Sequence, residues 1–225
     1  FMKKEFRKDI QGLRALSVLL IFCAHAGIDT FSGGYIAVDV FFVISGYVIT
    51  GLLLREYEKF GKIRLISFYG KRILRLMPAL LLLVVVSLLL SMLFLPPSQQ
   101  LYQYGAATAS MTWFSNIYFF AFDFDYFSPA IKENMFLHTW SLGVEEQFYL
   151  LWPLLVLWML KKSKNAPKIQ FLYLASFITI LSVTFHVLVS QNSQNAAFYL
   201  MPARVWQFCI GGAVVYWHMN FIASV

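Results

Sequence analysis

An arginine and a histidine lie at the two ends of an apolar run near the start of the chain, RALSVLLIFCAH, from Arg14 to His25. They are eleven positions apart, so a helix would place both on one face, about 16 Å apart along its axis. Ionisable groups within apolar spans are costly and by default mark functional sites. The imidazole could serve as a general base or as a nucleophile. In the structural alternative, Arg14 reaches lipid headgroups and His25 binds a neighbouring helix, which is less typical of a pair on one face.

Carboxylates also lie in apolar surroundings. Asp39 falls within SGGYIAVDVFFVISGY, and Glu145 and Glu146 fall within HTWSLGVEEQFYLLWP. None of them can face lipid unpaired. Asp39 is expected to pair with an arginine or to orient an imidazole, as the carboxylate of a catalytic triad does. Ser141, just ahead of the glutamates, is typical of a helix N-cap, and at least one glutamate is expected to face a cavity.

Basic side chains are grouped in YGKRILRLMP, where Arg72 and Arg75 are three positions apart and share a helix face. Two guanidinium groups on one face can bind phosphate oxygens in a bidentate manner. The alternative is an anchor at the cytoplasmic surface of the membrane. Arg204, in YLMPARVWQFCIGG, is expected to be an interfacial cation near the outer edge.

The composition is that of a membrane protein with several spans. Of the 225 residues, 60% are hydrophobic and 13% charged, and the mean hydropathy is +0.67, whereas a soluble domain is about 45–50% apolar and about 25% charged. The net charge of +7 forms no basic face outside short loops, so no nucleic-acid partner is expected. The four histidines show no metal-ligand spacing, so no metal site is expected.

We expect an all-α, polytopic membrane bundle with six to seven spans, one of which is re-entrant. The apolar runs near spanning length cover residues 13–28, 34–54, 76–95, 142–160, 171–189 and 201–217. The basic run KKEFRK places the N-terminus in the cytoplasm. The basic loop 161–168 lies on that side only if the weaker segment of about 104–122 re-enters instead of crossing. We favour re-entry, which would indicate a cavity.

Together these stretches resemble the membrane acyltransferase-3 family. The matching segments are FRKDIQGLRALSVLLIFCAH, GGYIAVDVFFVISGY, FYGKRILRLMPAL, LHTWSLGVEEQFYLLWP and YLMPARVWQFCIGG, in order over almost the whole chain. The resemblance implies an enzyme of the bacterial cytoplasmic membrane that moves an acyl group, often acetyl, from a coenzyme A thioester. The implied acceptor is a hydroxyl of an extracytoplasmic glycan or lipid-linked sugar, as in lipopolysaccharide O-antigen or peptidoglycan. No bound cofactor is implied, and acetyl-CoA is a substrate.

The resemblance also implies roles for residues. Arg14 and His25 match the family's Arg-x10-His motif, with His25 the catalytic histidine, and Arg72 and Arg75 match the Arg-x-x-Arg pair that handles the donor. Gln207 stands where relatives often have glutamate, so a carboxylate role there is absent. The family's membrane domain has more helices than this chain can hold. Residues 1–225 are therefore expected to be an N-terminal portion of it, without the extracytoplasmic SGNH-type domain of many relatives.

We therefore hypothesise that arginines hold the phosphates of acyl-CoA at the inner face while His25 acts on the acceptor hydroxyl or first takes the acyl group. Asp39 or Glu145 would fix the tautomer of His25. The donor-binding residues would be Arg14, Arg72 and Arg75. Candidates for acceptor binding or for structure are His138, Ser141, Glu146 and Arg204. A multi-pass transporter and a non-catalytic fragment are the alternatives.

Overall fold

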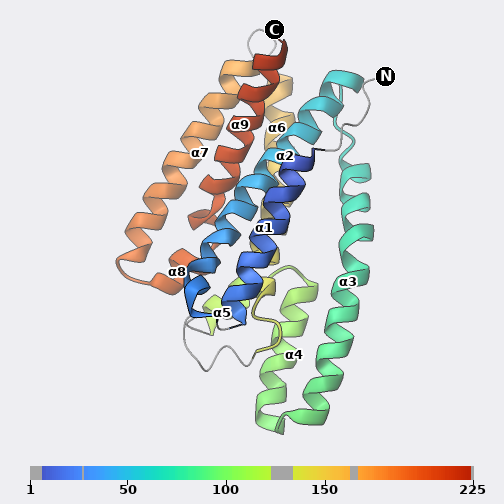
Figure 1. Cartoon of the computed structure of the whole chain (residues 1–225). Helices are drawn as coiled ribbons and strands as arrows, with labels where there is room; N and C mark the ends of the chain where they lie inside the picture. Colours follow the sequence, from blue (N-terminus) through green and yellow to red (C-terminus); the bar gives the residue numbers. More distant parts are fainter. Residues whose placement is uncertain (1–6, 27, 123–133, 163–166, 224–225) are drawn as a thin grey trace.

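The computed structural model describes residues 7–26, 28–122, 134–162 and 167–223, and every regular element in these ranges is helical (Figure 1). The elements are α1 Lys8–His25, η1 Asp29–Tyr35, α2 Ile36–Phe60, α3 Leu65–Phe94, α4 Pro97–Met111, α5 Ser115–Ala121, α6 Thr139–Lys162, α7 Pro167–Ser190, α8 Gln194–Tyr199, η3 Met201–Ala203 and α9 Val205–Ala223. The expected all-α bundle is thus confirmed.

Local sequence explains several of the helix ends. Gly61 ends α2 in the left-handed region, at φ 65°, where a residue without a Cβ carries no steric penalty. Proline lacks the backbone N–H and disfavours a helical conformation at the residue before it, although α3 and α6 each contain one, at Pro78 and Pro153. Pro96 therefore separates α3 from α4, and Pro97 occupies the first turn of α4, where the missing N–H is tolerated.

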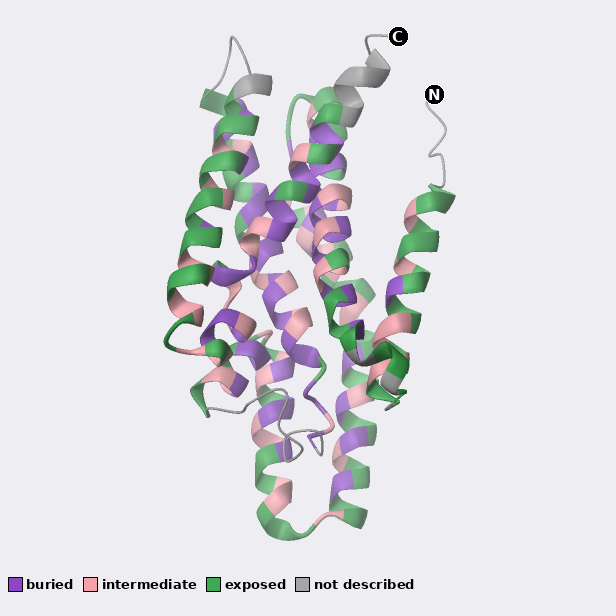
Figure 2. Ribbon diagram, turned by 60° about the vertical axis from the view of Figure 1, so that its left-hand side comes forward, coloured by how far each residue is buried: buried purple, intermediate pink, exposed green. Residues whose placement is uncertain are grey.

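Long apolar helices form the bundle. Within the described ranges, three helices are long and apolar enough to cross a membrane: Gly33–Phe60, Leu65–Phe94 and Gln170–Ser190. The apolar part of α9, Val205–Trp217, is shorter. The buried residues of Figure 2 gather along the sides of the helices that face one another, while much of α3 remains exposed. This pattern is expected when lipid covers the outer faces.

The core lies between α2, α6 and α9. Phe208 of α9 stacks on Phe42 of α2 at 4.7 Å and on Phe148 of α6 at 4.2 Å between ring centroids. The backbones of α2 and α9 touch at two glycines. A Cβ on Gly46 would overlap the backbone of Phe208, and one on Gly211 would overlap the carbonyl of Val43. Small residues permit this close approach of membrane helices.

The segment expected to re-enter does not form one long helix. It contains the end of the 15-residue helix α4, a turn at residues 112–114 and the short helix α5. In Figure 1, the C-terminal ends of α2 and α6 lie at the same end of the bundle as the start of α1. The described basic residues at these helix ends therefore share one end of the bundle, as the re-entrant alternative requires: Arg7, Lys8, Lys59, Lys161 and Lys162.

Candidate functional site

A buried ion pair joins α3 to α6 inside the bundle. Arg72 of α3 donates from Nε to both carboxylate oxygens of Glu146 at 2.8 Å, and its Nη2 also donates to Glu146. The Arg72 guanidinium carbon lies 3.4 Å from the centroid of the Tyr149 ring. Only 17% of the Arg72 side chain and 3% of the Glu146 side chain are exposed. Arg72 is therefore the charge partner of Glu146 inside the protein.

The neighbouring Glu145 connects this pair to α2. Its Oε1 accepts a hydrogen bond from the Tyr149 hydroxyl at 2.5 Å and another from the Ser45 hydroxyl. Arg72 Nη2 lies 4.0 Å from the same oxygen. Ser45, Arg72 and the two glutamates thus form one polar cluster among α2, α3 and α6.

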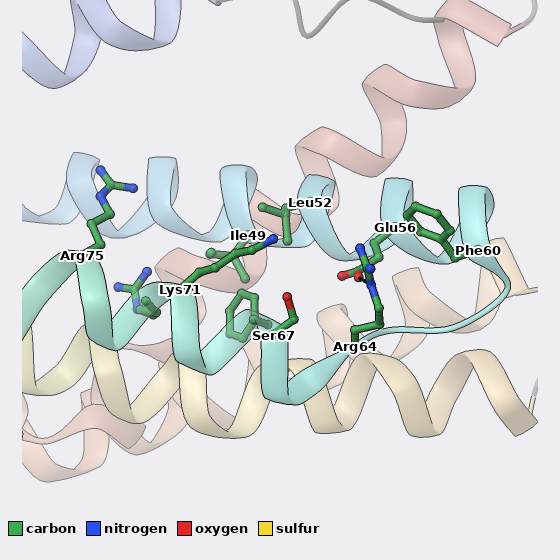
Figure 3. Close-up of a pocket in the computed structure, with 10 residues that line it drawn as sticks. Ile49, Leu52, Glu56, Phe60, Arg64, Ser67, Lys71 and Arg75 are labelled. Carbon is green, nitrogen blue, oxygen red and sulfur yellow. Dashed lines mark hydrogen bonds and ion pairs between the residues drawn. The ribbon is translucent and has the colours of Figure 1, made fainter.

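A basic groove runs between the C-terminal half of α2 and the N-terminal half of α3 (Figure 3). Its volume is about 330 Å³. Lys71 extends across the groove towards Ile49 and Leu52, and Arg75 stands at the far end from Arg64, which pairs with Glu56 at 2.8 Å. The ten lining residues are Ile49, Leu52, Glu56, Phe60, Arg64, Ser67, Phe68, Lys71, Arg72 and Arg75. The groove thus offers an anion several cations.

A second cavity, of about 180 Å³, lies between α3, α6 and the turn after α4. It is lined by Tyr69, Arg72, Ile73, Trp113, Glu146, Tyr149 and Leu150. Arg72 lines both this cavity and the basic groove, so its side chain stands at their common boundary. Glu146 is the glutamate that faces a cavity, as the sequence predicts.

His25 ends α1, and its ring is held by its own helix. Its Nδ1 lies 2.8 Å from the carbonyl oxygen of Ile21. When Nδ1 donates this bond, the neutral ring keeps its lone pair on Nε2, which is then the basic nitrogen. His138, just before α6, lies close enough to His25 to interact with it electrostatically. Desolvation by the surrounding protein, with a smaller effect of His25, lowers the pKa of His138.

The expected carboxylate partners of His25 are engaged elsewhere. Asp39 forms an ion pair with Arg204 at 3.0 Å, and Glu145 belongs to the Ser45 cluster. The expectation that one of them fixes the His25 tautomer is therefore wrong in this structure, because the Ile21 carbonyl takes that position. The neutral carbonyl is next to the ring in the same helical turn, whereas a carboxylate would have to come from another helix.

Arg204 is buried among the helices. It is 8% exposed, donates from Nε to the Phe198 carbonyl at 3.0 Å and packs on the Trp140 and Phe198 rings. The pairing with Asp39 compensates the charge of Arg204 inside the protein. Gln207, 1% exposed, lies beside Asp39.

Two further sequence predictions change. Ser141 is the third residue of α6, and its hydroxyl donates to the His138 carbonyl at 3.2 Å, so it does not cap the helix by accepting from a backbone N–H. Arg14 is half-buried on α1, and the ten residues that line the basic groove do not include it. Of the predicted donor arginines, the groove brings together Arg72 and Arg75 alone.

Sequence reasoning missed Ser45, Tyr149 and Trp113. Tyr149 could have been found, because it lies four positions after Glu145 and three after Glu146 and so shares their helix face. No spacing signal pointed to Ser45 or to Trp113. In the described ranges, no three His, Cys, Asp or Glu side chains gather as a metal-ligand set.

Comparisons with known proteins agree with the helical architecture and the motifs. The model of the acyltransferase domain family matches residues 7–225. An O-acetyltransferase OatA of Staphylococcus aureus is 39% identical over 186 residues, which is 82% of this chain and 30% of the relative. A peptidoglycan O-acetyltransferase OatA of Listeria monocytogenes is 33% identical over 224 residues, which is 99% of this chain and 36% of the relative.

The chain thus spans about a third of the length of these curated relatives. No solved structure matches it. Since the family model covers nearly every residue, including all the motifs and the polar cluster, the chain belongs to the acyltransferase domain family.

Proposed function

We propose that this chain carries the donor-binding part of a membrane O-acyltransferase, which moves an acyl group, acetyl in the simplest case, from acyl-CoA to a glycan hydroxyl. One observation carries the proposal: a groove with several cations meets, at Arg72, a mostly apolar cavity between α3 and α6. A donor with a phosphorylated end and a long neutral arm has this same division of charge.

The phosphates would bind in the groove through Lys71 and Arg75. Lysine binds phosphate as a point charge, and arginine adds two parallel hydrogen bonds. Both side chains are exposed and line the groove. Arg72 is already held by Glu146, so it contributes mainly at the boundary between the groove and the cavity. The basic end of the bundle would face the cytoplasm, where coenzyme A thioesters are made, with the N-terminus on that side.

His25 would act at the opposite end of α1. Its Nε2 would take the proton of the acceptor hydroxyl, whose oxygen attacks the thioester carbonyl. The C–S bond then breaks, and the thiolate of coenzyme A leaves and takes up the proton from the imidazolium. The variant in which Nε2 itself first takes the acyl group needs the same geometry. The name of the Listeria relative supports peptidoglycan as the acceptor, and other envelope glycans fit the same chemistry.

The test is transfer of label from radioactive acetyl-CoA to envelope glycan in membranes that carry the protein. His25→Ala is expected to abolish the transfer and to leave the folded protein in the membrane, because the side chain is exposed. Phe22→Ala, on the same helix and 68% exposed, is the matched control and should keep its activity. Undiminished transfer by His25→Ala would refute the role of the imidazole.

The groove has its own test. Arg75→Ala should raise the donor KM about ten- to hundredfold with little change in kcat, because one charge-assisted contact to phosphate is worth roughly 1.5–3 kcal/mol. Arg55→Ala, an exposed arginine of α2 that does not line the groove, is the control. An unchanged donor KM in Arg75→Ala would show that the phosphates of the donor do not bind in this groove.

A further inference from the structure

We propose that the cavity between α3 and α6 is the subsite for the acyl end of the donor, and that the indole N–H of Trp113 binds the thioester carbonyl oxygen there. The proposal rests on the proposed function, since it assigns a place to one part of the same donor. It makes Ile73 and Leu150 the residues that limit the length of the acyl chain.

The position of the cavity is the first reason. Arg72 lines both the cavity and the basic groove, so a donor whose phosphates lie in the groove can extend past Arg72 into the cavity. Glu146 lines the cavity and lies eight positions after His138, about 12 Å along a helix. The cavity therefore lies between the basic end of the bundle and the histidines.

The size and the walls of the cavity are the second reason. Its volume is about 180 Å³, and a protein cavity of about 150 Å³ holds a six-carbon ring. The acetyl group, the sulfur and two methylenes of the arm also amount to six heavy atoms. Ile73, Leu150 and the rings of Tyr69 and Tyr149 provide apolar contact. The cation that lines the cavity, Arg72, is already neutralised by Glu146, so a neutral ligand is favoured over an anion.

Trp113 is the third reason. Its Nε1 is buried and has no hydrogen-bond partner among the described residues. An indole N–H in such surroundings normally finds an acceptor, and leaving it without one is costly. Indole nitrogen is a donor only, so a ligand group placed beside it would have to be an acceptor. A thioester carbonyl oxygen is such an acceptor.

The backbone at Trp113 is held in an unusual conformation. Its φ is 61°, and among the described residues Trp113 is the non-glycine residue with a positive φ. For a bulky residue this conformation is a genuine outlier. Gln147 Nε2 donates to the Trp113 carbonyl at 3.1 Å and to Asn116 Oδ1 at 2.8 Å. A Cβ at Gly143 would lie 3.2 Å from the same carbonyl, so the turn packs directly on α6. Such strain persists where the surroundings fix a functional residue.

The first test changes the length of the cavity. Ile73→Ala should raise the ratio of butyryl to acetyl transfer about tenfold or more, because one methylene in an apolar pocket changes rates by about 10–200-fold. Ile73 is 43% exposed, so the change empties no core position. Leu74→Ala removes a similar side chain from the next residue, which is 78% exposed and does not line the cavity, and should leave the ratio unchanged.

The second test removes the hydrogen-bond donor of Trp113. Trp113→Phe keeps an aromatic ring and should lower kcat with acetyl-CoA about tenfold with little change in KM, since the bond strengthens as charge develops on the oxygen. Wild-type membranes that transfer no acetyl would refute the proposed function itself. If wild-type membranes transfer acetyl and Ile73→Ala leaves the butyryl-to-acetyl ratio unchanged, the proposed subsite is wrong although the proposed function stands. This outcome is decisive even if Trp113→Phe fails to fold. Stronger binding of membrane lipid by the Ile73→Ala variant, without a change in the butyryl-to-acetyl ratio, would also overturn the proposed acyl subsite.

Discussion

Arg72 and Arg75 have different environments, although the sequence presents them as equivalent members of one pair. Arg72 is locked between the carboxylate of Glu146 and the ring of Tyr149, whereas Arg75 remains exposed in the groove. Substitution of Arg72 thus disturbs the fold as well as the donor site. An activity loss at Arg72 alone says little about phosphate binding.

The Arg72–Glu146 pair yields a stability prediction. Glu146→Gln should destabilise the protein by about 3–5 kcal/mol, because it leaves a buried guanidinium without its counter-charge. The double variant Arg72→Met/Glu146→Met should lose less than Glu146→Gln, since it leaves no isolated charge. Thermal unfolding in detergent measures both. Glu56→Gln, whose partner Arg64 is half-exposed, is the control and should cost no more than about 1 kcal/mol. A double variant at least as unstable as Glu146→Gln would contradict this account.

Residue types could be predicted to be important, but their partners could not. The cost of burying Asp39, Glu146 and Arg204 follows from the apolar runs that contain them. Which cation meets which carboxylate depends on helix packing: Asp39 and Arg204 are 165 positions apart in the chain. The partner of His25 was missed for the opposite reason, since the Ile21 carbonyl belongs to the backbone, which a motif of side chains does not display.

At the scale of elements, the contact between α2 and α9 is the closest in the bundle. The sequence contains the signal, since Gly46 and Gly211 interrupt apolar runs, but glycine alone does not identify the helix that approaches it. The end of α3 was predicted well, because the pair Pro96–Pro97 follows it. The end of α2 was not, because its apolar run stops at residue 54 while the helix continues through charged residues to Phe60. The turn at Trp113 was not predicted from the sequence, because no glycine occupies the position with the positive φ.

Gly46→Ala should therefore be destabilising. The new methyl group would overlap the backbone of Phe208, which cannot rotate away as a side chain can. Overpacking costs about 1–3 kcal/mol, which lowers the midpoint of unfolding in detergent. Gly70→Ala in α3 has open space around the new Cβ and is the matched control; it should be neutral or stabilising by about 1 kcal/mol. Equal effects of the two substitutions would refute the close approach of α2 and α9.

At the scale of the molecule, the α4–α5 segment decides on which side the later loops lie. With Cys23 and Cys209 replaced by Ala, a membrane-impermeant maleimide added to intact spheroplasts should label Gln191→Cys, beyond α7. It should not label Lys59→Cys at the end of α2 or Lys162→Cys at the end of α6 until the membrane is opened. Labelling of Lys162→Cys in intact spheroplasts would mean that the segment crosses the membrane.

The backbone contact between α2 and α9 also divides the bundle mechanically. Helices whose backbones touch cannot slide past each other without a clash, so α2, α9 and the rings packed on them should move as one body. Ser17 is the buried residue of α1, and α3 is largely exposed. α3 carries Lys71, Arg72 and Arg75 and forms one wall of the basic groove, whose other wall belongs to α2. Microsecond-to-millisecond shear of α3 during a catalytic cycle would therefore change the donor groove while the scaffold stays still.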